Sequence, residues 1–203
     1  MPALLLALSI QLMGILSPGP GVMLILGVAT SRGRDASLIT ALGIACGSMV
    51  LAIATVIGVT AILAGLANAM TVLRWIGAAY LIWLGCKSLK TAWKNPPLPE
   101  IAETDERPIR TALTGFGLQV TNPKAIGFWL AIAAVGGIGE APMPIVILFV
   151  IMAGLNSFIG HGAYAVALSS SPIRASYGRF RRWIDGTLGS LFLLAGLRLA
   201  ASK

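Results

Sequence analysis

The chain has 203 residues, of which 57% are hydrophobic and 11% are charged. A soluble domain of this length needs far more polar surface, so the composition excludes that class and predicts an integral membrane protein. The formal net charge of +8 does not indicate nucleic-acid binding. The basic residues stand at the ends of apolar runs, where lipid head groups and the positive-inside bias place them.

Six apolar runs predict an all-α membrane protein with six transmembrane helices. The first run has no Lys or Arg before it and continues past any cleavage site, so we expect a spanning helix rather than a signal peptide. The expected spans are about residues 3–30, 38–66, 71–92, 112–136, 145–168 and 183–200.

The connections between these runs divide the chain into two halves. Residues 95–110 are rich in prolines and charges and predict a cytoplasmic linker. The linker separates a first three-helix repeat, residues 1–94, from a second, residues 111–203, within one membrane domain. Because each half has three spans, the second half enters the membrane from the opposite side, and the halves are expected to be inverted repeats. Residues 31–35 are expected to form a short charged turn and residues 169–182 a basic loop.

The basic residues also orient the chain. With the N-terminus outside, the inner turns and loops carry most of the Lys and Arg residues, and the outer side carries only Arg74, Arg198 and Lys203. Positive charge collects on the cytoplasmic side of a membrane. We therefore expect a multi-pass protein of the bacterial inner membrane, in contact with the lipid bilayer, with both termini on the periplasmic side.

The stretch Ser17-Pro18-Gly19-Pro20-Gly21 interrupts the first apolar run. Two prolines and two glycines break a helix, because proline removes a backbone donor and clashes with the preceding turn. In lipid, such a break is tolerated only where the freed groups are buried in protein or line a cavity. Ser17 is also a favourable N-cap and Pro18 a favourable first helical residue. A half-helix is therefore expected to begin at Pro18, near mid-membrane.

A second helix break is expected in the fourth run, at Thr121-Asn122-Pro123-Lys124. Here Asn122 is a favourable N-cap and Pro123 a favourable first helical residue. Two interrupted helices at matching places in two halves predict a transporter binding site at the bilayer midplane. Their N-termini would face each other, and two positive dipole ends suit a carboxylate. The expected substrate-binding residues are Ser17, Pro18, Gly19, Pro20, Gly21, Asn122, Pro123 and Lys124.

Lys124 is the strongest single candidate, because an ionisable side chain at membrane depth is costly and usually serves function. It could bind a substrate carboxylate, which we favour, or neutralise a buried acid. Alternatively, its long side chain could snorkel or pack against protein. Ser17, Thr121 and Asn122 could likewise touch the substrate or only cap the half-helices.

Four further residues are candidates for gating or proton coupling. Arg34 and Asp35 stand at the cytoplasmic end of the first span, where gating and structural pairing fit equally well. His161 is the only histidine in the chain. Its intrinsic pKa suits a proton carrier, although a core or cavity-lining histidine is the commoner case. Asp185 stands at the start of the sixth predicted span.

Other functional classes find little support. Ser157 and His161 lie four apart on one predicted helix, so a membrane-embedded enzyme can be imagined, but no nucleophile elbow or oxyanion loop accompanies them. A thiol-relay protein would need paired cysteines near the helix breaks, whereas Cys46 and Cys86 stand elsewhere and are best interpreted as packing residues. We expect no metal, no cofactor and no enzymatic activity.

Several motifs resemble one family of bacterial transporters. They are Ser-Pro-Gly-Pro-Gly at 17–21, Arg-Gly-Arg at 32–34, and the stretches 73–85, 121–125 and 189–192. In order and spacing they resemble the LysE/RhtB family of amino-acid exporters, and its homoserine/threonine branch more than its basic-amino-acid branch. The resemblance implies export of an amino acid across the inner membrane, driven by the proton gradient.

The residues inside the predicted spans bear on the substrate and on assembly. No Asp or Glu stands inside the second or fifth predicted span, so neutral or apolar amino acids are favoured over cationic ones. Glycine-rich helix faces could pack within one chain or between two, which leaves a homo-oligomer open.

Overall fold

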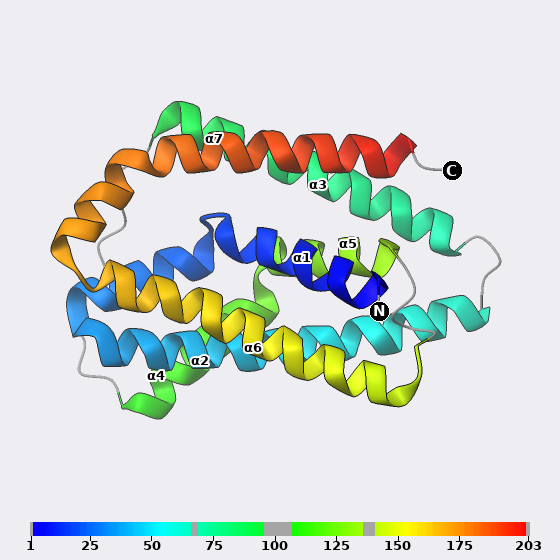
Figure 1. The fold of residues 1–203 in the computed structure, drawn as a ribbon, viewed down its shortest axis with the longest axis horizontal. Helices are drawn as coiled ribbons and strands as arrows, with labels where there is room; N and C mark the ends of the chain where they lie inside the picture. The colour runs from blue at the N-terminus through cyan, green and yellow to red at the C-terminus, as the bar shows by residue number, and fades with distance from the viewer. Residues whose placement is uncertain (1, 66–68, 96–106, 136–140, 202–203) are drawn as a thin grey trace.

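The computed structural model describes residues 2–65, 69–95, 107–135 and 141–201, and over these residues the chain forms seven helices and no strand (Figure 1). This part of the chain is therefore all-helical, as the apolar runs predict. The helices are α1 (Pro2–Leu16), α2 (Pro20–Gly65), α3 (Ala69–Lys94), α4 (Pro108–Thr121), α5 (Pro123–Val135), α6 (Met143–Leu168) and α7 (Ser171–Ala201).

Gly33 divides α2 into two segments that run in opposite directions (Figure 1). Its backbone has φ 80° and ψ −171°, a combination that is essentially restricted to glycine. Residues 20–32 therefore continue away from α1, and residues 34–65 return along the bundle. The charged turn expected at residues 31–35 falls at this reversal.

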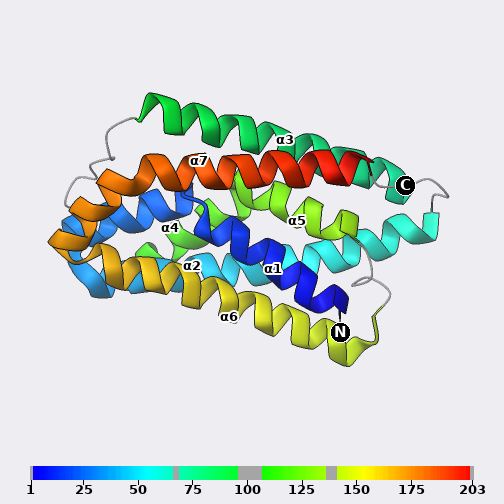
Figure 2. The ribbon, with the colours of Figure 1, turned by 45° about the horizontal axis from the view of Figure 1, so that its top comes forward.

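The remaining helices lie roughly parallel or antiparallel to these segments (Figures 1 and 2). The Gly33 turn, the last residues of α3, the first residues of α4 and the α6–α7 connection gather at one end of the bundle. The described N-terminal and C-terminal residues lie toward the other end.

The prediction of a basic loop at residues 169–182 is wrong, because α7 already begins at Ser171. Its start has the local marks of a helix, since the Arg174 amide donates to the Ser170 carbonyl at 2.9 Å. Tyr177 and Arg181 then lie four residues apart on one buried face. A high density of arginines does not predict a loop, because arginine is itself a good helix former.

The linker expected at residues 95–110 lies mostly outside the described residues. At its end, residues 108–110 are helical, because α4 begins at Pro108 and the Thr111 amide donates to the Arg107 carbonyl at 3.1 Å. Proline is favourable at this first position, where its missing N–H would have no helical partner.

Within the described residues, three helical stretches are long and apolar enough to cross a membrane: Pro20–Gly58, Met143–Leu168 and Ser171–Ala201. Two shorter apolar helices, Ala3–Leu16 and Pro123–Ala134, flank the interruptions. Large apolar side chains are exposed on most helices, as in Ile57, Ile159 and Leu194. Such a surface suits contact with lipid rather than water, and it identifies an integral membrane protein.

Glycines allow the helices to approach closely, as small residues do in membrane bundles. A Cβ at Gly85 of α3 would lie 2.7 Å from the Leu193 nitrogen of α7. On α2, Gly43 faces the backbone of Ala112, and a Cβ at Gly47 would lie 2.8 Å from Gln119 Cβ. The glycine face formed by Gly43 and Gly47 therefore packs against α4 of the same chain.

Candidate functional site

The first helix interruption comprises residues 17–19, between α1 and α2. The prediction that Ser17 is the N-cap of the next helix is wrong. The Ser17 amide still donates to the Met13 carbonyl at 3.1 Å and so completes the last turn of α1. Helix α2 begins two residues later than expected, at Pro20, and the Gly19 carbonyl accepts its first bond from Met23 at 2.9 Å. Both Pro18 and Pro20 are eligible as first helical residues, and the second one takes that place.

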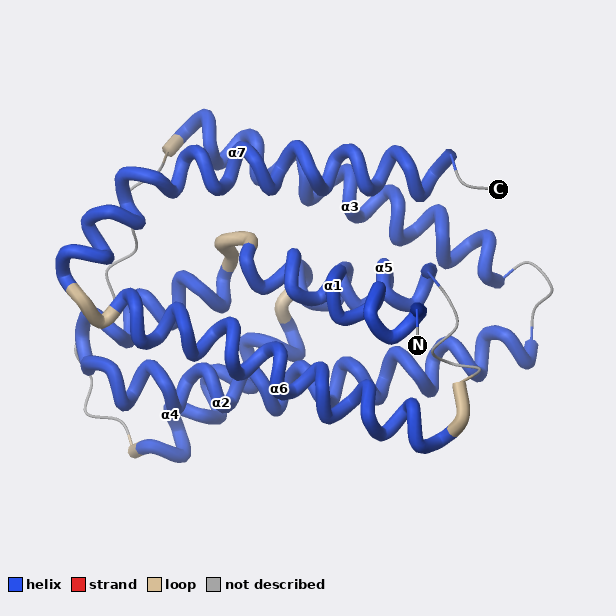
Figure 3. The backbone as a smooth tube through the Cα atoms, viewed as in Figure 1, coloured by secondary structure: helices blue, strands red, loops and turns tan. Residues whose placement is uncertain are grey.

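The second interruption is Asn122, between α4 and α5. Its Oδ1 accepts a hydrogen bond from the Lys124 amide at 3.0 Å, and its carbonyl accepts one from the Ile126 amide at 3.0 Å. Pro123 is the first residue of α5. The expected N-cap and first helical residue are therefore confirmed at this position. Figure 3 shows both interruptions as short loops between helices inside the bundle.

Lys124 joins the two interruptions. Its Nζ donates to the Gly14 carbonyl at 3.0 Å and to the Ser17 carbonyl, so the ammonium binds the last turn of α1. A cation in this place satisfies carbonyls that lack helical partners and complements the negative end of the helix dipole. The side chain lies directly over Gly19, where a Cβ would be 2.7 Å from Lys124 Cδ.

Two tyrosines form hydrogen bonds with the backbone next to the interruptions, each from the opposite half of the chain. Tyr80 of α3 donates its hydroxyl hydrogen to the Pro123 carbonyl. Tyr164 of α6 donates to the Leu16 carbonyl at 2.8 Å. Each interruption is therefore held by a side chain from the other half.

A cavity of about 50 Å³ lies where the starts of α2 and α5 meet, and we call it the central cavity. The first turn of α2 contributes Gly21 and Val22, whose amides precede the first helical bond and so lack intrahelical partners. The start of α5 contributes Lys124 and Ala125. Ser17 also lines this cavity, and its buried Oγ has no hydrogen-bond partner among the described residues.

A chain of hydrogen-bonded side chains reaches the central cavity from α4, α2 and α6. Gln119 Nε2 donates to Ser48 Oγ at 2.9 Å, and Ser48 Oγ donates to Ser157 Oγ at 2.9 Å. Ser157 Oγ lies 3.3 Å from Nδ1 of His161, which lines the cavity together with Ser48 and Gln119. His161 is thus a cavity-lining residue with a polar partner.

Gln11 adds a second polar link, between α1 and α6. Its Nε2 donates to the Ala153 carbonyl at 2.8 Å, and its Oε1 accepts from Asn156 Nδ2 at 2.9 Å. Gln11, Ser48 and Gln119 are absent from the sequence-predicted site. The available signal was their polarity inside long apolar runs, which is as informative as a charge there.

A larger cavity, of about 260 Å³, adjoins the central one, and we call it the α3–α7 cavity. It shares Gly19, Asn122 and Lys124 with the central cavity. Its further lining includes Lys87 of α3 and the ion pair of α7, in which Arg181 Nε lies 3.5 Å from Asp185 Oδ2. Both members of this pair are buried.

Most of the sequence-predicted site residues line one or other of the two cavities. The central cavity takes Ser17, Gly19, Gly21, Asn122, Lys124 and His161, and the α3–α7 cavity takes Pro18, Pro20, Pro123 and Asp185. Arg34 and Asp35 are exposed beside the Gly33 turn, at the end of the bundle, and line neither cavity. Cys46 and Cys86 are free thiols that also line neither cavity.

Internal cavities that adjoin two breaks between helices inside an apolar bundle are the arrangement typical of membrane transporters. Residues 12–203 match the family model described as LysE type translocator, and the chain belongs to this family. Its class is thus that of translocators rather than enzymes, which sets aside the Ser157–His161 alternative.

Several curated relatives are similar over most or part of the chain. The threonine efflux proteins of Salmonella typhimurium and Escherichia coli K12 are each 28% identical to it, over 96% of this chain and 95% of their own length. A leucine efflux protein of Enterobacter is 31% identical over 58% of this chain and 55% of its own length. No solved structure matches the chain.

Proposed function

We propose that this protein exports amino acids with neutral side chains from the cytoplasm across the bacterial inner membrane, driven by the proton gradient. Membership of the translocator family and the similarity to threonine and leucine efflux proteins support the transport of amino acids. The observation that carries the proposal is the meeting of two helix N-termini and one ammonium, that of Lys124, at a single internal cavity.

That arrangement suits a carboxylate. The starts of α2 and α5 present the positive ends of two helix dipoles, and the first-turn amides of α2 lack helical acceptors. Ser17 Oγ adds a buried hydroxyl that has no partner. A carboxylate would satisfy these donors, and it could replace the α1 carbonyls as the partner of Lys124.

The rest of the central cavity suits a neutral side chain. Its apolar wall is formed by Phe128, Trp129 and Ile132. Its polar wall is formed by uncharged Gln11, Ser48 and Gln119, and no lining residue in the described part of the chain is acidic. A cationic side chain would therefore lack a counter-ion there.

We further propose that the chain crosses the membrane six times as two inverted three-helix repeats, residues 1–94 and 111–203, with both termini outside. In this arrangement α1 with residues 20–32 forms the first span and α4 with α5 the fourth, each interrupted near mid-membrane. The reversal at Gly33 and the gathering of the described termini at one end of the bundle agree with it (Figures 1 and 2). Labelling of single cysteines placed at the Gly33 turn and in the α6–α7 connection would test it, since both should react only from the cytoplasmic side.

Proton coupling requires an ionisable group that reaches the path of the substrate. His161 lines the central cavity, whereas Arg34 and Asp35 lie away from both cavities. We therefore propose His161 as the proton-coupling candidate and assign Arg34 and Asp35 to the cytoplasmic turn.

The test is amino-acid efflux from cells that express the chain and are loaded with dipeptides of threonine, leucine, alanine or lysine. Efflux of one or more neutral amino acids that stops when the proton gradient is collapsed is expected. Efflux of lysine alone would contradict the proposed specificity. Neutral efflux that survives collapse of the gradient would contradict the proposed coupling.

A further inference from the structure

The volumes of the two cavities show where an amino acid fits in this conformation. A protein cavity of roughly 150 Å³ holds a molecule of benzene, with six heavy atoms. The central cavity, about 50 Å³, is well below that size, whereas the α3–α7 cavity, about 260 Å³, exceeds it. An amino acid such as threonine, with eight heavy atoms, is therefore excluded from the central cavity here and admitted to the larger one.

The α3–α7 cavity is also built for a molecule that carries both charges. Its lining includes Asp185 and the cationic residues Lys87, Lys124 and Arg181. Lys87 is exposed at the edge of the cavity, where its Nζ lies 4.9 Å from the centroid of the Trp83 ring, and its flexible side chain would turn from that ring to meet a carboxylate. The contact of Asp185 with Arg181, 3.5 Å from Oδ2 to Nε, is longer than the 2.7–2.9 Å or so of a charge-assisted hydrogen bond. Asp185 is the acidic residue in the lining of this cavity, so it is the counter-ion that an entering ammonium group would meet.

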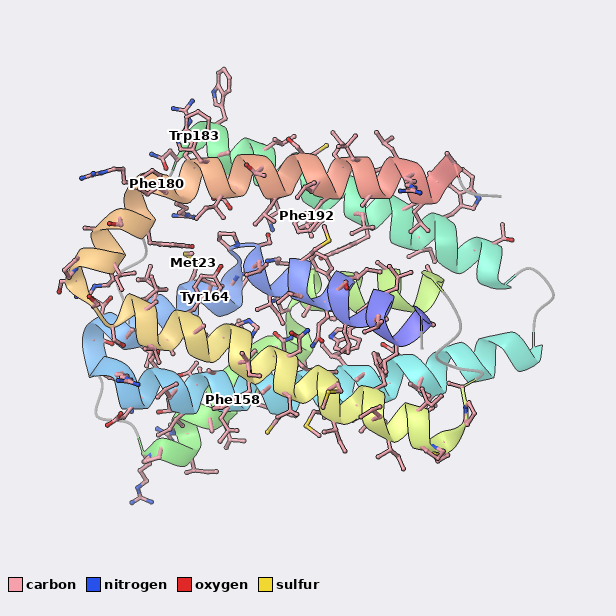
Figure 4. The ribbon with its side chains drawn as sticks, viewed as in Figure 1. Met23, Phe158, Tyr164, Phe180, Trp183 and Phe192 are labelled. Carbon is pink, nitrogen blue, oxygen red and sulfur yellow. The ribbon has the colours of Figure 1, made fainter. Side chains whose placement is uncertain are left out.

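The cavity lies toward one end of the bundle. Lys87, Ser88 and Thr91 belong to the last turns of α3, and Asp185 belongs to the first half of α7. These parts of α3 and α7 lie on the side of the Gly33 turn, and Figure 4 shows Met23, another lining residue, between α2 and α7. In the proposed orientation this is the cytoplasmic side, from which an exporter takes its substrate.

We propose that the α3–α7 cavity is a separate docking site for zwitterionic amino acids, occupied before the central cavity, in which Asp185 binds the α-ammonium and Lys87 the α-carboxylate. Lys124 lies at the boundary of the two cavities and there blocks passage while it binds the last turn of α1. The inference rests on the proposed export of amino acids and adds a site, and a residue for each charged group of the substrate.

The experiment uses L-threonine and two analogues, 3-hydroxybutyrate, which lacks the ammonium, and 1-amino-2-propanol, which lacks the carboxylate. Their binding to the purified protein is measured by calorimetry. Asp185→Asn is expected to weaken threonine binding by about tenfold or more while binding of 3-hydroxybutyrate is kept or improved. Lys87→Gln is expected to weaken binding of threonine and 3-hydroxybutyrate but not of the amino alcohol. A purely structural role would weaken all three together.

Asp35→Asn is the matched control, because it removes the same charge at the same end of the bundle from an exposed position outside both cavities. It should leave all three affinities unchanged. If Asp185→Asn has the same preference for threonine over 3-hydroxybutyrate as the unchanged protein, the assignment is overturned. If the unchanged protein neither exports nor binds threonine or leucine, the proposed export of amino acids fails as well. Failure of the docking site alone is therefore distinguishable from failure of the proposed function.

A second measurement does not depend on the folding of the Asp185 variant. In a chain with Cys46→Ala and Cys86→Ala, Ser88→Cys places a thiol in the lining of the cavity. Threonine is expected to slow its reaction with a methanethiosulfonate reagent. Asp35→Cys, at the exposed position beside the Gly33 turn and outside both cavities, provides the unprotected comparison. Equal reaction rates at Ser88→Cys with and without threonine, in a protein that exports threonine, would overturn the docking site.

Discussion

The Nζ of Lys124 donates to the Gly14 carbonyl at 3.0 Å, across a separation of 110 positions in the sequence. One residue at the start of α5 thereby binds the last turn of α1. The two interrupted helices are thus joined by a single ammonium, and this ammonium also lines both internal cavities. A ligand that drew the Lys124 ammonium away from these carbonyls would loosen its contact with α1, which offers a physical link between binding and helix movement.

Gly19→Ala should impair export without unfolding the protein. The added Cβ would lie 2.7 Å from Lys124 Cδ and 2.9 Å from its Nζ. The flexible lysine can move away, so the fold is kept, but its ammonium is displaced from the meeting point of the two helix starts and its bond to the substrate carboxylate is weakened. Bonds to charged groups contribute about 1.5–3 kcal/mol, so a fall in export of roughly tenfold or more is expected.

The efflux rate per protein molecule, normalised to the amount in the membrane, measures this effect. Gly117→Ala is the control, because nothing lies within 4 Å of its added Cβ and it borders neither cavity. Equal export by the two variants would show that the position of Lys124 does not matter.

Ser17→Ala separates a substrate contact from a structural role. Ser17 Oγ is buried without a partner, and a hydroxyl of this kind costs stability. The free energy of unfolding should therefore stay the same or rise by about 1 kcal/mol, whereas the KM for the exported amino acid should increase. Thermal unfolding in detergent and efflux kinetics measure the two quantities. A clear loss of stability with an unchanged KM would contradict the role proposed for this hydroxyl.

The sequence predicted the second interruption better than the first, for a local reason. At Asn122-Pro123 only one residue can cap and only one proline can follow, so the local rule has a single solution. At the first interruption two prolines compete, and the amide of Ser17 stays with α1. The choice between Pro18 and Pro20 depends on packing, which the local sequence does not contain.

Contacts between distant residues could not be predicted in the same way. The hydrogen bond from Gln119 to Ser48 joins residues 71 positions apart, and that from Ser48 to Ser157 joins residues 109 apart. Polarity in an apolar run marks such residues as candidates, but their partners follow only from the helix arrangement. The start of α7 was missed because its arginines were assigned to a loop, although Arg181 and Asp185 lie on a buried helical face.

Gly85→Ala should destabilise the pairing of α3 with α7. The added Cβ would lie 2.7 Å from the Leu193 nitrogen and 2.8 Å from the Gly189 carbonyl oxygen, and backbone atoms cannot move aside as a side chain can. Overpacking of this kind costs about 1–3 kcal/mol. A lower midpoint of thermal unfolding in detergent is expected, with Gly58→Ala, whose Cβ would meet nothing within 4 Å, as the control. An unchanged midpoint would mean that the two helices can separate without cost.

The proposed binding site for the substrate carboxylate lies where Lys124 meets the starts of α2 and α5. Its most direct test is proton-driven efflux of threonine and leucine by the Lys124→Met variant, compared with Lys94→Met, which removes an exposed charge at the end of α3. Lys124→Met is expected to reach the membrane but to lose export, while Lys94→Met exports normally. Full export by Lys124→Met would show that the carboxylate is bound elsewhere.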